Sequence, residues 1–191
     1  IPTLQVNYRI PSKHRHYLLR DEVSAARTTF EYCRAKGRRR ISAVFLYTTD
    51  AQRARQTVYE RTARDYPDLS FRCHTIGDDR QLYTIDMARA LYQSMDDAMV
   101  RSVMRGADVI LGLSTYAEMF YRRMCSMGIR IPGDIGFIMD GAMYAERAYF
   151  PEVSRVGVRT DTMIDAIMAF VHGERKRSAA MASQVFEGET A

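Results

Sequence analysis

The side chain best placed to do chemistry is an aspartate at the end of an apolar run. The stretch GIRIPGDIGFIMDG contains Gly128, where a helix can end, and Pro132, which forbids the helix from continuing. The strand-like run 135–139 follows, and Asp140 comes directly after it. In a parallel sheet Asp140 would lie at a carboxyl end, where ligands bind in open α/β sheets. It could equally cap the following turn, and the pattern alone leaves both interpretations open.

Common catalytic and phosphate-binding motifs are not found in the sequence. It contains no G-x-S-x-G elbow, no P-loop, no G-x-G-x-x-G turn and no H-E-x-x-H helix. Its histidines are His14, His16, His74 and His172, and only the first two are close enough in the sequence to share a site. We therefore expect a protein that is not an enzyme, needs no cofactor and holds no metal.

The three cysteines, Cys33, Cys73 and Cys125, are odd in number and show no C-x-x-C spacing. Cys33 and Cys125 fall on apolar faces of predicted helices, so free, buried thiols in a reducing compartment are expected. No run approaches about 18 consecutive apolar residues, and the first ten residues lack the pattern of a signal peptide. We therefore expect a cytoplasmic protein without a membrane span.

Positive charge is concentrated in the first part of the chain. Residues 1–75 hold 15 lysine and arginine residues against 7 aspartate and glutamate residues, whereas the rest holds 13 against 16. The densest cluster, RAKGRRRI at 34–41, permits two interpretations. It could contact nucleic acid. Alternatively it could end a helix at Gly37, with Lys36 and nearby arginines complementing the helix dipole.

Apolar periodicity predicts strands and helices that alternate along the chain. Strands are expected at residues 3–6, 41–47, 69–75, 107–114, 134–139, 153–158 and 183–188. Helices are expected at about 21–36, 48–65, 83–104, 114–128 and 161–171. This order indicates an α/β protein with parallel sheets flanked by helices.

Five segments in register resemble the LacI/GalR family of transcription regulators. MGIRIPGDIGFIMDG resembles the family's helix end Gly-Leu-x-Val-Pro and the following strand, which closes in Gly-Phe-Asp. The other resembling segments are IPTLQVNY, LLRDEVSAARTTFEYCRAKGRRRISAVFL, RQTVYERTARDYPDL and FPEVSRVGV. The resemblance covers nearly all of the chain and implies the periplasmic-binding-protein-like fold. That fold has two α/β lobes joined by three crossovers, with a ligand between the lobes.

The resemblance also implies how the chain divides. The N-terminal lobe is expected to comprise residues 1–48 and 157–181 and to be incomplete, and the C-terminal lobe residues 49–156 and 182–191. Family members begin with a helix-turn-helix segment and a hinge, which would precede these residues, so operator DNA would be contacted only through that missing segment. Strands missing from the first lobe would leave an apolar edge open, which favours contacts between copies and a homodimer.

The same resemblance implies a set of ligand-binding positions. They are Asn7, Asp21, Thr49, Arg55, Tyr83, Leu113, Ser114 and Asp140. Arg55 matches the family's ligand-binding arginine, whose forked donors suit vicinal hydroxyls or a carboxylate. Asp140 matches the strand-end aspartate that accepts hydrogen bonds from ligand hydroxyls. Asn7 stands where the family has a strand-end aspartate, and Tyr83 could offer a stacking face.

Several positions depart from the family pattern. Leu113 and Ser114 stand in place of Asn-Asp, and Leu113 cannot hydrogen-bond a hydroxyl. The acid of Gly-Phe-Asp is moved by one residue in Met139-Asp140-Gly141, and a shift of one residue along a strand changes the face that a side chain occupies. Arg155 stands in place of a threonine. These departures put the usual sugar specificity in question.

The expected function is therefore that of an effector-sensing and dimerisation domain of a LacI-like regulator. It would bind a small molecule, a sugar or related polyol, between its lobes and so control DNA binding by the helix-turn-helix segment. The alternative is a solute-binding protein of the same fold that serves transport.

Overall fold

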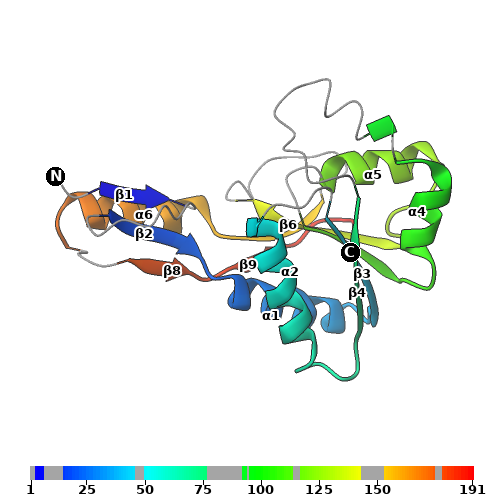
Figure 1. Cartoon of the computed structure of the whole chain (residues 1–191), viewed down its shortest axis with the longest axis horizontal. Helices are drawn as coiled ribbons and strands as arrows, with labels where there is room; N and C mark the ends of the chain where they lie inside the picture. Colours follow the sequence, from blue (N-terminus) through cyan, green and yellow to red (C-terminus); the bar gives the residue numbers. More distant parts are fainter. Residues whose placement is uncertain are drawn as a thin grey trace.

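The computed structural model describes residues 3–6, 15–45, 50–76, 92–93, 95–113, 117–142, 153–174 and 178–191. Within these ranges the chain forms two sheets, which lie at opposite ends of the elongated molecule in Figure 1. The strands are mostly parallel and the helices pack on their faces, so the predicted α/β class is confirmed.

The smaller sheet has three parallel strands in the order β1-β2-β8. Its elements are β1 (Thr3–Val6), β2 (Arg15–Arg20), β8 (Ala179–Met181) and helix α6 (Thr160–Val171). Its core consists of Leu18, Val158 and Met181, against which one side of α6 packs. The other side of α6 leaves large apolar side chains in solvent, of which Val171 is 67% exposed.

The larger sheet has six strands in the order β4-β3-β5-β6-β7-β9. The strands are β3 (Arg40–Phe45), β4 (Ser70–Thr75), β5 (Val109–Gly112), β6 (Gly136–Ala142), β7 (Ser154–Gly157) and β9 (Gln184–Phe186). The first five are parallel, and β9 runs antiparallel to β7. The helices that cover this sheet are α1 (Glu22–Ala35), α2 (Asp50–Ala63), α4 (Asp97–Met104) and α5 (Ala117–Ser126).

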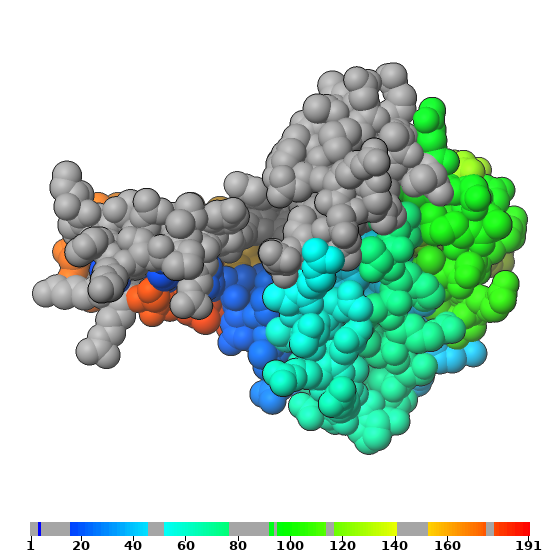
Figure 2. Space-filling model, in the orientation of Figure 1, coloured from blue at the N-terminus to red at the C-terminus, as the bar shows by residue number. Residues whose placement is uncertain are grey.

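Two apolar cores fill the two faces of the larger sheet. Because side chains alternate along a strand, Val44 and Phe137 face α4 and α5, while Phe45 and Ile138 face α1 and α2. On the second face Phe30 of α1 lies against an aromatic cluster and is fully buried. This arrangement buries residues 41–45 of β3, all of β5 and residues 136–140 of β6, as their continuous apolar runs predict. The outer surface of α2 is visible in cyan in Figure 2.

Helix α1 has a cap at each end. Asp21 accepts a hydrogen bond from the backbone of Ser24 at 2.9 Å, which is the N-cap contact. At the other end Gly37 has a φ of 73°, and the N–H of Arg38 donates to the carbonyl of Cys33 at 2.8 Å. This is the glycine-ended C-cap, in which a residue in the left-handed region terminates the helix. The helix-ending interpretation of the basic cluster is confirmed.

Acidic partners surround the same basic cluster. Arg34 donates to Asp68 at 3.0 Å, and the backbone N–H of Arg40 donates to Asp108 at 2.9 Å. Lys36 forms an ion pair with Glu187. The charges therefore serve local contacts, which argues against a dedicated nucleic-acid surface here.

Several sequence predictions differ from the structure. The single helix expected over 83–104 is interrupted, because Met95 and Asp96 are not helical and α4 begins at Asp97, where Asp96 caps it and accepts from Met99 at 2.7 Å. The first part of that prediction, residues 83–91, lies outside the described residues. Strands β2 and β8 were not predicted. Cys125 is exposed rather than buried, while Cys33 is buried as expected and Cys73 is intermediate.

The boundary between the sheets also differs from the expected lobe boundary. β3 pairs with β4 and β5 and not with β1 or β2, so residues 22–45 belong with the larger sheet. The chain crosses between the sheets after Arg20, whereas the lobe boundary was expected at residue 48. Among the described helices, none is both long enough and apolar enough to span a bilayer.

Candidate functional site

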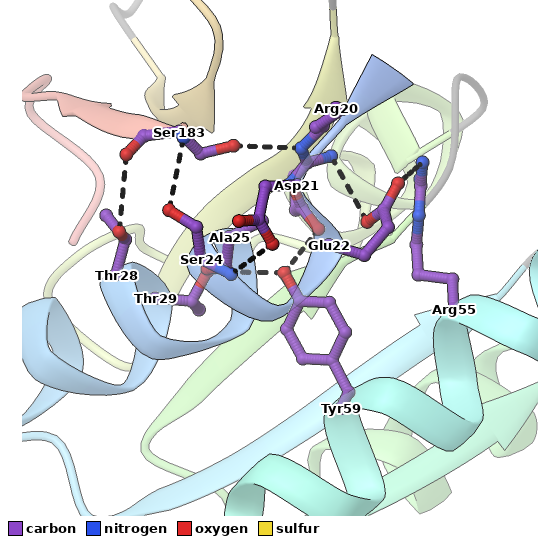
Figure 3. A network of polar contacts seen from close by, with 11 residues as sticks. Arg20, Asp21, Glu22, Ser24, Ala25, Thr28, Thr29, Arg55, Tyr59 and Ser183 are labelled. Atoms are coloured by element: carbon purple, nitrogen blue, oxygen red, sulfur yellow. Dashed lines mark hydrogen bonds and ion pairs between the residues drawn. The ribbon is translucent and has the colours of Figure 1, made fainter. Parts of the chain in front are cut away.

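A cluster of charged side chains lies where the two sheets meet. Within the described part of the chain, three connections join the sheets, at about residues 20–22, 157–160 and 181–184. Two of them are bonded together, since the N–H of Asp21 donates to the carbonyl of Met181 at 2.8 Å. Arg20 ends β2 and Glu22 begins α1, so both side chains stand at the first connection (Figure 3).

Asp140 lies at the base of this cluster. It sits on β6 beside a register shift between Asp140 and Ala142, where β6 carries one more residue than β7. Strand alternation points Met139 toward the core under α4 and α5, and Asp140 toward α2 on the opposite face. Its side chain is 0% exposed, with one oxygen accepting from Arg20 and the other from the hydroxyl of Tyr59. Asp140 is thus held by two donors from different elements.

Arg20 connects the smaller sheet to the larger one. Its Nη2 pairs with Asp140, and its Nε donates to Ser183 Oγ at 3.0 Å. Burial alone would lower the pKa of Arg20, but the charges of Asp140 and Glu22 and the hydrogen bond to Asp140 offset burial and raise it, so the side chain stays cationic. A buried pair of this kind is costly to break, because the partner that is left remains charged without water.

Tyr59 completes the buried part of the cluster. It projects from α2 and is 0% exposed. Burial raises the pKa of Tyr59, and the neighbouring Asp140 raises it further, so the phenol stays protonated and can donate to the carboxylate. The ring also packs edge-on against Phe30, at 5.9 Å between centroids. The polar contact is therefore backed by the apolar core of the α1 and α2 face.

Glu22 and Arg55 form the more open part of the cluster. Arg55 Nη2 donates to Glu22 Oε1 at 2.8 Å, and the two side chains are 21% and 28% exposed. The other carboxylate oxygen of Glu22, Oε2, lies 3.9 Å from Nη1 of Arg20. Figure 3 shows Glu22 between the two arginines. Two guanidinium groups and two carboxylates therefore alternate from Asp140 out to Arg55, and their charges balance.

The structure brings together only some of the residues predicted from the sequence. Arg55 and Asp140 both belong to the cluster. Asp21 caps α1, and Leu113 is fully buried in the core beneath α1 and α2. The remaining predicted positions lie outside the described residues; they are Asn7, Thr49, Tyr83 and Ser114.

Four members of the cluster were not predicted: Arg20, Glu22, Tyr59 and Ser183. Arg20 carries a detectable signal, since it ends the partly apolar run HYLLR, which forms β2. When the side chain of an arginine at a strand end points into the protein, its buried charge needs an acidic partner. The identity of that acid, 120 residues away at Asp140, is visible only once the sheets are assembled.

Among the comparisons with known proteins, only the solved structures give matches, and they share one fold. No family model matches the chain, and no curated protein sequence matches it. A periplasmic binding protein/LacI transcriptional regulator from Alkaliphilus metalliredigens, complexed with D-xylulofuranose, superposes with a TM-score of 0.71 at 18% identity, covering 100% of this chain and 71% of that one. A LacI family regulator from Arthrobacter sp. FB24, complexed with lactose, gives 0.69 at 14% identity, covering 99% and 71%.

A third similar structure, the Escherichia coli transcriptional repressor ascG, gives a TM-score of 0.65 at 10% identity, covering 97% of this chain and 68% of that one. At identities this low, the superpositions establish the fold alone. The chain has the periplasmic-binding-protein-like fold found in LacI-type regulators, as the sequence resemblance implied. All three proteins are described as regulators or binding proteins and none as an enzyme.

Proposed function

We propose that this chain is the effector-sensing part of a LacI-like transcription regulator and that it binds a small hydroxylated molecule, a sugar or related polyol. The observation that carries the proposal is the charged cluster at the junction of the two sheets. It contains Arg55 and Asp140, two positions at which the sequence resemblance implies ligand contacts. Ligand sites in open α/β sheets lie outside the carboxyl ends of the strands, and Asp140 lies in that part of β6.

The proposed mechanism is a change in the angle between the sheets. A ligand that contacts both sheets stabilises the closed arrangement in proportion to its differential affinity for it. Two of the crossovers are short and hydrogen-bonded together, so they can act as hinges. In the parent protein this equilibrium would set the spacing of helix-turn-helix segments in a cytoplasmic homodimer, coupling effector and operator by about 1–3 kcal/mol.

The printed ligands of two similar structures suggest the first compounds to test. The panel would contain D-xylulose, lactose, other pentoses and hexoses, polyols, nucleosides, sugar phosphates and sugar acids. A compound present at 100 times its Kd adds about 2.7 kcal/mol of stability, which for a chain of this size raises Tm by about 5–11 °C. The expected result is a rise of this size for at least one neutral sugar or polyol. A panel without any rise would count against effector sensing by this chain.

A solute-binding protein that serves transport is the second candidate, because one similar structure is described as a periplasmic binding protein as well as a regulator. The two functions predict different behaviour of the parent protein. A regulator would retard a DNA fragment from its own promoter region, and the effector would change that retardation. Its mass by light scattering would be that of a dimer. A monomer that binds the sugar tightly and no DNA would favour transport.

A further inference from the structure

Two buried polar atoms of the cluster lack a hydrogen-bond partner among the described residues. They are Nη1 of Arg20 and Oε2 of Glu22. The Arg20 side chain is 5% exposed and the Glu22 side chain 28% exposed, so the pair stands at the transition from the buried to the open part of the cluster. A buried donor or acceptor without a partner is destabilising, so each atom favours any group that can bond to it.

The spacing of these atoms defines what fits between them. They lie 3.9 Å apart, too far for a direct hydrogen bond. An oxygen placed about 2.8 Å from each would meet both at normal hydrogen-bond lengths. Nη1 can only donate and Oε2 can only accept, so the bridging group must accept one bond and donate another. A hydroxyl group does both.

Charge narrows the class of ligand further. Arg20 and Arg55 are already balanced by Asp140 and Glu22, so no net positive charge among these four awaits an anion. A phosphate or carboxylate at this position would face Glu22 at close range, and an ammonium group would face Arg20. Like charges this close are unfavourable in a partly buried site. The position therefore suits a neutral hydroxyl.

Both side chains are held in place by their other contacts. Arg20 is fixed by Asp140 and by Ser183, which is 3.0 Å from its Nε. Glu22 is fixed by Arg55 at 2.8 Å. Side chains that are fixed before the ligand arrives lose less conformational entropy on binding.

We propose that Arg20 and Glu22 together bind one hydroxyl group of the effector, which accepts from Nη1 of Arg20 and donates to Oε2 of Glu22. The inference rests on the proposed function and makes the effector a neutral hydroxylated molecule. Asp140 then acts as a positioning residue, because it orients Arg20 and does not itself contact the ligand. This differs from the direct contact with ligand hydroxyls that the sequence resemblance implies.

The test compares Glu22→Gln with Glu187→Gln in the full chain. Both remove a carboxylate that pairs with a basic side chain, but Glu187 lies in the exposed pair with Lys36 at the end of α1. The probe is the neutral sugar of the panel that gives the largest thermal shift, together with its monodeoxy derivatives, titrated by calorimetry. Far-UV circular dichroism and a urea midpoint establish that each variant is folded. Should Glu22→Gln fail to fold, Glu22→Asp replaces it, because the shorter side chain moves the carboxylate away from the bridging position and keeps its charge.

We expect Glu22→Gln to weaken binding of the sugar about 10- to 150-fold, the loss for a hydrogen bond to a charged group, and Glu187→Gln to stay within about twofold of wild type. One monodeoxy derivative, the one that lacks the hydroxyl bound by Arg20 and Glu22, should bind wild type weakly. It should bind Glu22→Gln with the same weak affinity, because the hydroxyl that Glu22 would contact is absent.

Three results would count against the inference. If Glu22→Gln binds the sugar within twofold of wild type, the two atoms hold a structural water only. If only sugar phosphates or sugar acids bind, sensing stands and the neutral-hydroxyl site is wrong. If nothing in the panel binds wild type, the proposed function fails, and this inference fails with it.

Discussion

The buried pair of Arg20 and Asp140 should be a strongly coupled contact between the two sheets. Removing one partner of such a pair typically costs about 3–5 kcal/mol, because the other charge stays buried without compensation. We therefore expect Arg20→Met and Asp140→Asn each to destabilise the chain by about 3 kcal/mol or more. The double variant has no buried charge left in this pair, so its loss of unfolding free energy should be much smaller than the sum of the losses in the two single variants. The expected coupling energy is about 2–3 kcal/mol.

Urea unfolding measures this coupling. The chain has 12 tyrosines and no tryptophan, so tyrosine fluorescence and far-UV circular dichroism are the two probes to compare. With a slope of about 1–3 kcal/mol per molar urea, a loss of 3 kcal/mol moves the midpoint by about 1 M or more. The same cycle on Arg130 and Asp134, an i,i+4 ion pair on the surface, serves as the control and should show no coupling above error.

The reasoning would be refuted by near-additive effects of Arg20→Met and Asp140→Asn. That result would mean that the two side chains do not depend on each other, and that the sheets are oriented by apolar packing alone. If Asp140→Asn lowers the free energy of unfolding only slightly and Arg20→Met lowers it strongly, Arg20 contributes through packing of its aliphatic part. Either outcome would also weaken the assignment of Asp140 as a positioning residue.

Three further predictions concern other parts of the chain. Burial and the neighbouring Arg72 lower the pKa of His74 below its ordinary 6.5, so its contribution to stability is present above pH 6.5 and is lost as pH falls from there toward the lower folded-state pKa. His74→Gln should reduce the dependence of the urea midpoint on pH in that window. An unchanged dependence would contradict this. Gly37→Ala should cost about 1 kcal/mol by urea unfolding, because Gly37 has a φ of 73° while an added Cβ would meet nothing within 4 Å. A neutral result would show that the turn relaxes. Burial raises the pKa of Cys33 to about 12, whereas Cys125 is exposed, so an aromatic disulfide reagent at pH 8 should label Cys125 first and Cys33 only on unfolding. Cys125→Ser should remove the rapid phase, and its persistence would show that another thiol reacts first.

Much of the larger sheet could be predicted from the sequence, because its central strands are continuous apolar runs and three of its helices, α1, α4 and α5, are followed by glycines with positive φ. Gly128, with a φ of 77°, follows the end of α5 where the sequence predicts it. Residues 136–139 of the predicted run form the first part of β6, and Asp140 follows them within the same strand, still buried.

The rest of the site depends on pairings between distant segments. The segment that forms β2 is half polar, so nothing in its pattern distinguishes a strand from a loop, although β2 is the central strand of the smaller sheet. The function of Arg20 depends on a carboxylate from another sheet, and local propensity contains no information about such a partner. The misplaced lobe boundary has the same origin, since β3 follows α1 closely yet pairs with β5, which comes more than sixty residues later.

The three connections between the sheets have a consequence for folding. Leu18 of β2 pairs with Ala179 of β8, so nearly the whole chain lies within the loop that this pairing closes. Contacts of such high sequence separation form late and slowly, because the entropy of closing the loop is lost before any contact compensates for it. We expect β3 to β7 of the larger sheet to form first, while the smaller sheet waits for residues 160–181 and the larger sheet waits for β9 to emerge from the ribosome. No single cut in the backbone can separate two fragments that each carry one complete sheet, so the two sheets should be inherited, expressed and degraded as one unit.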